Sequence, residues 1–350
     1  MEFFHGVNID WMGKAKYFVT LSLILLAVGW ISVWRQGLRY GIDFRGGTLV
    51  VVRFNSTPPI DQIRKGMDAA GLHGTITSIH DFSDPNSKND VQISLERAGQ
   101  TDQALDADRQ AVLEALNKTF GANGTFTIRG VESVGPKVGA QLRNQAFWAT
   151  MYALGGMLIY VAIRFSGGDL FLRGPSGGGF GGFVRRWIDT IIFGAAAVIA
   201  CFHDVLITLG FFSLIHYEIS LTVIAALLTL VGYSMNDTIV IFDRVRENLR
   251  LMRRESFPDI VNKSINQTLS RTILTSGLTL LTVLVLYLVG GEVLRAFSFA
   301  MVVGVVVGTY SSFGIAAPIV VVWNKYQSTK GAAIRVGSAA EKRAMATARR

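Results

Sequence analysis

The feature that most constrains this chain is a set of long apolar runs with almost no charge. Half of the 350 residues are hydrophobic and 17% are charged, against roughly 25% in a soluble domain. Runs of about 20 residues cross ~30 Å of hydrocarbon at 1.5 Å per residue. They cover residues 17–34, 145–163, 188–215, 219–242, 272–291 and 296–323. We therefore expect a multi-pass α-helical membrane protein with six transmembrane helices, in contact with membrane lipid.

Basic residues indicate how the helices are oriented. Four Lys/Arg lie in 164–186, seven in 244–271 and seven after Trp323, whereas the intervening turns 216–218 and 290–295 hold none and one. Lys and Arg accumulate in cytoplasmic loops. We therefore expect both termini in the cytoplasm. The excess basic residues behind the net charge of +9 lie in short segments beside the apolar runs, so we expect no nucleic-acid partner.

Residues 36–144 form the large segment on the opposite, external side. It holds 12 basic and 12 acidic residues between Gly37 and Ala146, so it is neutral. Val- and Thr-rich stretches predict strands at 48–54, 75–82, 91–95 and 125–131. Helices are expected from about Pro58 to Gly71 and from Thr101 or Asp102 to Gly121, with a turn at 84–86. The order βαββαβ predicts an α+β ferredoxin-like domain. We expect a binding or mechanical domain and no enzyme, because no catalytic set is suggested.

The remaining segments divide the chain into four parts. Residues 1–35 form a cytoplasmic N-terminus and first helix, 36–144 the external domain, 145–323 the other five helices, and 324–350 a basic cytoplasmic tail. The loop 164–187 includes the Gly-rich stretch 167–183, which lacks the lysine of a phosphate-binding loop and reads as a flexible connection. Within 244–270, residues 246–267 predict an amphipathic helix on the cytoplasmic face, with Leu249, Met252 and Ile260 buried. The single cysteine, Cys201, indicates packing, and we expect no metal or cofactor.

Asp237 is the strongest candidate functional residue. A charge near the centre of a transmembrane helix costs at least ~2.5–3.5 kcal/mol and persists mainly where function or pairing requires it. Asp237 lies six residues, or about 9 Å, inside Asp243. Its neighbours Asn236, Thr238 and Ser234 are candidates to hold a buried carboxylate or a water. A buried acid near a movable cation can bind and release a proton, so Asp237 is a candidate for a proton relay. The alternative is that Asp237 forms only a structural hydrogen bond.

Other polar residues in the apolar runs are secondary candidates. Arg271 opens the fifth run on the same side as Asp237, so it is either a partner of Asp237 or an interfacial anchor. His203 and Asp204 point about 100° apart on a helix, and they either join a proton relay or tie helices together. Asp243 is expected at the interface, and the alternative is a supporting role in the proton relay. Spaced four apart, Gly304 and Gly308 favour close helix packing.

Several motifs together resemble one family. They are Gly-Ile-Asp-Phe-Arg-Gly-Gly-Thr at 41–48, Val-Gly-Pro-Lys-Val-Gly at 134–139, His-Asp-Val-Leu-Ile-Thr-Leu-Gly at 203–210, Val-Gly-Tyr-Ser-Met-Asn-Asp-Thr-Ile-Val-Ile-Phe-Asp-Arg at 231–244 and Arg-Thr-Ile-Leu-Thr-Ser-Gly at 271–277. Over nearly its whole length the chain resembles the SecF family of the bacterial SecD–SecF protein-export complex, within the resistance-nodulation-division superfamily. Two features depart from that pattern: Arg45 stands where the family usually has Thr, and the loop 164–186 is longer than usual.

The resemblance implies a function and a location. It implies an accessory subunit in the bacterial cytoplasmic (inner) membrane that uses the proton motive force to complete preprotein export after the motor SecA. The large domain would be periplasmic. Implied partners are SecD, the SecYEG channel, YajC, YidC and the preprotein. In the family, the residues that match Asp237 and Arg271 are implicated in proton conduction.

Three other functions compete with this expectation. One is a superfamily half-transporter for small molecules or lipids, although six helices and one external domain are few for such an exporter. Another is a passive scaffold that stabilises the translocon without moving protons. A membrane enzyme is the weakest of the three.

Overall fold

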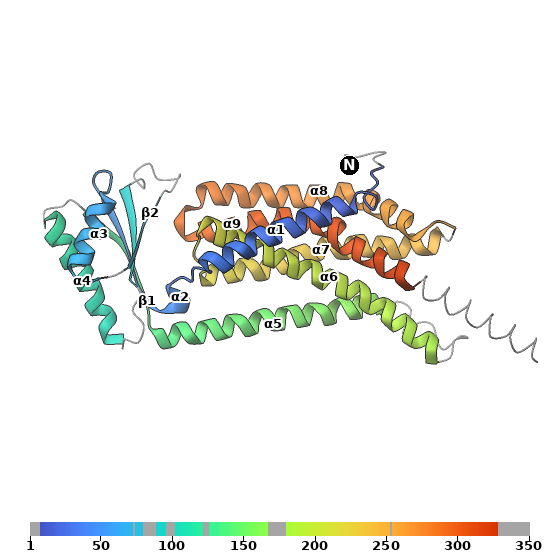
Figure 1. Ribbon diagram of the computed structural model, residues 1–350, viewed down its shortest axis with the longest axis horizontal. Helices are drawn as coiled ribbons and strands as arrows, with labels where there is room; N and C mark the ends of the chain where they lie inside the picture. The colour runs from blue at the N-terminus through green and yellow to red at the C-terminus, as the bar shows by residue number, and fades with distance from the viewer. Residues whose placement is uncertain are drawn as a thin grey trace, which may run out of the picture.

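A bundle of long helices and a small α/β domain form the two ends of the computed structural model (Figure 1). The structure describes residues 8–72, 74–79, 89–95, 102–121, 126–166, 180–252 and 254–327. The long helices are α1 (Ala15–Gln36), α5 (Pro136–Ser166), α6 (Phe180–Ile215), α7 (Leu221–Leu251), α8 (Phe257–Val289) and α9 (Gly291–Ser311). A π-helical turn, Ser312–Ala316, follows α9, and α-helix continues to residue 327.

Five helical segments are long and apolar enough to cross a membrane among the described residues. They are Ala15–Gln36, Ile192–Ile215, Leu221–Leu251, Phe257–Val289 and Leu294–Gln327. The sixth expected span, 145–163, lies in α5, a continuous helix of 31 residues that is not among the five. The sixth span therefore stays a prediction.

The small domain has the predicted order of strands and helices. Its elements are β1 (Gly47–Phe54), α3 (Ile60–Ala69), β2 (Gly74–Ile79), β3 (Asp90–Leu95), α4 (Asp102–Phe120) and β4 (Phe126–Val134). The strands form one antiparallel sheet in the order β2-β3-β1-β4, with α3 and α4 on one face (Figure 1). Alternate residues of β1, including Val50 and Val52, are buried against Ile63 and Leu116. The predicted turn at 84–86 lies outside the described residues.

A short helix, α2 (Ile42–Arg45), joins this domain to the bundle. The carboxylate of Asp43 accepts a hydrogen bond from the backbone N–H of Leu221, the first residue of α7, at 2.8 Å. Beside it, the backbone N–H of Gly41 donates to the carbonyl of Ile219 at 2.9 Å. Phe44 is buried in the same apolar cluster as Ile219. The domain is therefore bonded directly to the start of α7.

Glycines set how closely several helices approach. The Cα atom of Gly210 in α6 is only 2.8 Å from where a Cβ on Gly29 of α1 would stand. In α9, a Cβ on Gly304 would meet Leu230, and one on Gly308 would lie 3.0 Å from the Cβ of Ser234. The predicted packing role of Gly304 and Gly308 is confirmed, and their neighbour is α7.

The predicted amphipathic helix at 246–267 is wrong as a single element. Helix α7 continues to Leu251, and α8 begins at Phe257. Ser256 caps the N-terminus of α8 by accepting a hydrogen bond from the N–H of Asp259, with a proline in the first turn. Proline cannot continue a preceding helix but suits a first turn. Of the residues expected to be buried, Ile260 is buried and Leu249 is exposed.

Candidate functional site

Asp237 lies in the middle of α7 with its side chain turned toward α8. It is 4% exposed, and its Oδ2 accepts a hydrogen bond from the hydroxyl of Ser276 at 3.1 Å. Thr272, one helical turn before Ser276, is also buried, and its hydroxyl has no hydrogen-bond partner. The carboxyl group is therefore enclosed between two helices with one donor.

Arg271 is the cation whose charge acts on Asp237. It precedes Ser276 on α8 by five residues, a rise of about 7.5 Å, and its side chain is exposed. Both residues are described, and the structure shows no hydrogen bond or ion pair between them. The predicted proximity is therefore present without direct pairing. A small movement of the Arg271 side chain would change the electrostatic environment of the acid.

The three predicted supporting residues beside Asp237 do not contact it. Ser234 donates its hydroxyl hydrogen bond to Asp204 instead. Thr238 donates to the carbonyl of Ser234 in its own helix, and Asn236 is exposed. Successive residues of a helix point in different directions. Closeness in sequence therefore did not identify the partner of the acid.

Asp204 forms a second buried polar cluster where α6, α7 and α9 meet. It is fully buried. Its Oδ2 accepts hydrogen bonds from Ser234 at 2.6 Å and from Ser311 at 2.8 Å. Its Oδ1 lies 2.9 Å from the Nδ1 of His203. The adjacent His203 and Asp204 are therefore bonded after all. Ser311 directly precedes the π-helical turn, a feature frequent at functional sites.

The remaining candidate, Asp243, lies outside both clusters. Its carboxylate forms an ion pair with Arg164 of α5 at 2.5 Å, and both side chains are partly exposed. The neighbouring Arg244 bonds to Gln267 and Glu247. Asp243 therefore joins α7 to α5, and its position at the membrane interface stays a prediction. The Gly-rich stretch 167–183 falls mainly outside the described residues.

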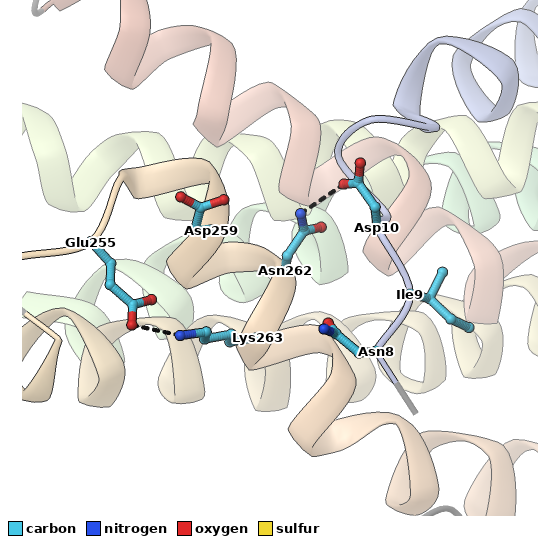
Figure 2. A pocket seen from close by; sticks show the side chains of 7 residues that line it. All are labelled: Asn8, Ile9, Asp10, Glu255, Asp259, Asn262 and Lys263. Atoms are coloured by element: carbon cyan, nitrogen blue, oxygen red, sulfur yellow. Dashed lines mark hydrogen bonds and ion pairs between the residues drawn. The ribbon is translucent and has the colours of Figure 1, made fainter. Parts of the chain in front are cut away.

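A polar pocket lies away from Asp237, at the start of α8. Figure 2 shows the N-terminal segment (residues 8–14) crossing this helix beside a pocket of about 430 Å³. Its lining residues are Asn8, Ile9, Asp10, Glu255, Asp259, Asn262 and Lys263. The amide of Asn262 donates to Asp10 at 2.8 Å, and Lys263 pairs with Glu255. The pocket therefore belongs to an attachment of the N-terminal segment. No group of His, Cys, Asp or Glu suited to a metal occurs in the part of the chain that the structure describes.

These features define a multi-span membrane protein with an α/β domain hydrogen-bonded to a helix that carries a buried acid. The family described as "Protein export membrane protein SecD/SecF, C-terminal" matches residues 112–168 and 190–326. The "SecD/SecF GG Motif" matches residues 31–58.

The similar proteins identify the family more closely. Protein translocase subunit SecF of Koribacter versatilis is 41% identical, with 98% of each chain covered. SecF of Calditerrivibrio nitroreducens is 42% identical over 89% of this chain and 93% of its own. The chain belongs to the SecF family of protein translocase subunits.

A solved structure supports the same assignment. The crystal structure of SecDF from Thermus thermophilus, described as a translocon-associated membrane protein, matches with a TM-score of 0.74 and 36% identity. The match covers 91% of this chain and 39% of that chain. The present chain therefore spans about two-fifths of the SecDF chain.

Proposed function

We propose that this chain is the proton-coupled subunit of a SecD–SecF complex. In this proposal it uses the proton motive force to promote late, SecA-independent steps of preprotein export. The observation that carries the proposal is the buried Asp237, which has a single hydroxyl donor and a cation nearby. Protons are the coupling ion, no cofactor takes part, and the chain is not an enzyme.

The proton motive force supplies enough free energy for one proton at such a site to bias a conformational equilibrium. One proton that crosses 100 mV supplies about 2.3 kcal/mol, and a few kcal/mol strongly bias a two-state equilibrium. When Asp237 binds a proton, its attraction for Arg271 is lost, and the packing between α7 and α8 changes. Protonation therefore biases the position of these two helices.

Helix α7 offers a direct mechanical connection to the external domain. It is continuous from Leu221, which Asp43 of α2 caps, to Asp237. These 16 residues span about 24 Å. A shift of α7 would move α2 and, through it, the sheet domain, which we class as ferredoxin-like. We propose that this movement pulls or retains the emerging polypeptide.

The proposed arrangement in the bacterial inner membrane uses six spans, with α5 as the sixth. The N-terminal segment, the turn between α7 and α8 and the end of the helix that continues α9 to residue 327 lie toward the end of the bundle away from the sheet (Figure 1). Those segments carry the basic residues. The positive-inside rule then gives cytoplasmic termini and a periplasmic domain.

SecD is the proposed direct partner. Helix α7 keeps a row of small and polar residues exposed, spaced three and four apart: Thr222, Ala225, Thr229, Gly232 and Asn236. A Cβ on Gly232 would meet nothing within 4 Å. Small residues allow close helix association in membranes, and in the SecDF relative more than half of the chain lies outside the match. SecYEG, YajC, YidC and the preprotein are proposed as further partners on the family resemblance.

The test is completion of preprotein export in membrane vesicles with an imposed proton gradient. We would compare the wild-type complex with Asp237→Asn, at equal membrane levels. Asp243→Asn is the matched control, because it makes the same chemical change on the same helix outside the site. Late stalling in Asp237→Asn alone supports the proposal. Normal, gradient-dependent export in Asp237→Asn would favour a passive scaffold or another proton path.

A further inference from the structure

The buried cluster around Asp204 contains an imidazole nitrogen that nothing satisfies. His203 is 7% exposed, and its Nε2 has no hydrogen-bond partner among the described residues. Its other nitrogen, Nδ1, lies 2.9 Å from Asp204. A buried polar atom without a hydrogen-bond partner costs free energy, so such atoms are rare in native structures and each one calls for an explanation. The position of this atom therefore needs an explanation beyond helix packing.

The charges of His203 and Asp204 indicate that Nε2 can accept a proton. With Asp204 ionised and His203 neutral, Nδ1–H donates to the carboxylate and Nε2 carries a free lone pair. The pair then bears one negative charge that only the hydroxyls of Ser234 and Ser311 offset. Within the described residues, no Lys or Arg pairs with Asp204. One proton bound at Nε2 would convert the pair into a neutral imidazolium–carboxylate pair.

The surroundings contain few other groups that could titrate. Cys201 on α6 and Tyr310 on α9 both interact electrostatically with Asp204. The hydroxyl of Tyr310 bonds to Ser22 of α1 at 2.8 Å. Helix α7 contributes only the hydroxyl of Ser234 to the cluster. The thiol and the phenol, whose ordinary pKa values are about 8.5 and 10, already carry their protons at neutral pH and so do not compete for an incoming proton.

We propose that His203 and Asp204 form a second proton-binding site, distinct from Asp237, with Nε2 of His203 as the acceptor atom. This inference rests on the proposed proton-coupled function. The proton forms an N–H bond with the Nε2 lone pair, and no other bond is made or broken. Ser234, three residues before Asp237 and in close contact with Gly308, connects the site to the packing between α7 and α9.

The direct test is nuclear magnetic resonance of the purified full chain in lipid nanodiscs, with ¹⁵N-labelled histidine imidazoles. His203→Asn assigns the signal, and the imidazole of the exposed His216 provides a reference signal. We expect Nε2 of His203 to gain a proton within the pH range in which the protein stays folded. We also expect Asp204→Asn to move that transition to lower pH. An Nε2 that stays unprotonated, or a transition unaffected by Asp204→Asn, would overturn the inference.

A functional test separates proton binding from helix packing. In His203→Asn, the side-chain amide stands near the position of Nδ1 and can still donate to Asp204, but no Nε2 remains. We expect this variant to lose part of its gradient-dependent export while its membrane level stays normal. Full gradient-dependent export would mean that the pair only ties helices together. A failure of Asp237→Asn to affect export would instead contradict the proposed function and leave the His203 titration unchanged.

Discussion

At the scale of single residues, the hydroxyl of Ser276 is the only hydrogen-bond donor to Asp237 among the described residues. Ser276→Ala would leave the acid buried without that donor. A hydrogen bond to a charged group contributes about 1.5–3 kcal/mol, so we expect roughly a tenfold or greater shift in the proton equilibrium of the site. Gradient-dependent export by Ser276→Ala should fall, and Ser276→Thr should restore part of it. Unchanged export in Ser276→Ala would show that Asp237 does not depend on this bond.

Asp10 makes the attachment of the N-terminal segment to α8 dependent on pH. The backbone N–H of Gly13 and the amide of Asn262 lower the pKa of this carboxyl. The attachment is therefore fully stabilised above the unfolded pKa of about 3.9, and the stabilisation is lost as pH falls through the lower folded value. We expect the protection factors of the Met12 and Gly13 amides, corrected for the intrinsic pH dependence of amide exchange, to fall upon acidification. Asp10→Asn should lack this response, and an identical response in both proteins would contradict the assignment.

The charged candidates were predictable from sequence, whereas their partners were not. A charge inside an apolar run is visible without a structure, so Asp237, Arg271 and Asp204 were found. Ser276 and Ser311 lie on other helices, and no spacing rule connects residues across helices. Their only signal was a hydroxyl in an apolar run, as in the motif at 271–277. Serines are common in such helices, so this signal was too weak.

At the scale of helices and strands, the contact between α7 and α9 depends on glycine. A large side chain at Gly308 would displace Ser234, and overpacking a well-packed core costs about 1–3 kcal/mol. We expect Gly308→Leu to lower the thermal stability of the protein in detergent and to weaken export. Gly155→Leu on α5 is the control, because a Cβ there meets nothing within 4 Å. Equal stability losses in the two variants would argue against a specific contact.

The hydrogen bond that Asp43 accepts from the first residue of α7 can be removed to test the proposed mechanical connection between α7 and the sheet domain. Loss of a helix N-cap costs about 0.5–2 kcal/mol, so we expect Asp43→Ala to loosen α2 from α7 without unfolding either part. Export should slow, while proton binding at Asp237 stays intact. Asp61→Ala is a suitable control because that carboxylate is exposed. Normal export by Asp43→Ala would mean that the external domain moves by another route.

Strands and helices of the external domain were predicted well, whereas the boundary between α7 and α8 was not. Alternation along β1 and the Gly and Pro residues around it mark that strand plainly. The segment 246–267 has a helical pattern on both sides of a break, so periodicity alone joined the two helices. The sequence Ser256-Phe257-Pro258-Asp259 contained the boundary signal. The cap and the proline should have outweighed the periodicity.

At the scale of the whole molecule, the two ends have different tasks. The sheet domain and α2 meet the start of α7, and the basic segments gather toward the other end (Figure 1). Asp237 lies between them on the same continuous helix. In the proposed function, one element therefore links proton binding inside the bundle to movement of the sheet domain. This arrangement could not be predicted from sequence, because the bond between Asp43 and Leu221 joins residues 178 positions apart.

Proton flux is the measurement that tests this account most directly. The complex with SecD would be reconstituted in liposomes that contain a pH-sensitive dye, and a proton gradient would then be imposed. We predict flux with the wild-type chain and with Asp243→Asn, and loss of flux with Asp237→Asn, whose side chain cannot release a proton. Equal flux through the wild type and Asp237→Asn would contradict the claim that Asp237 carries the coupling proton.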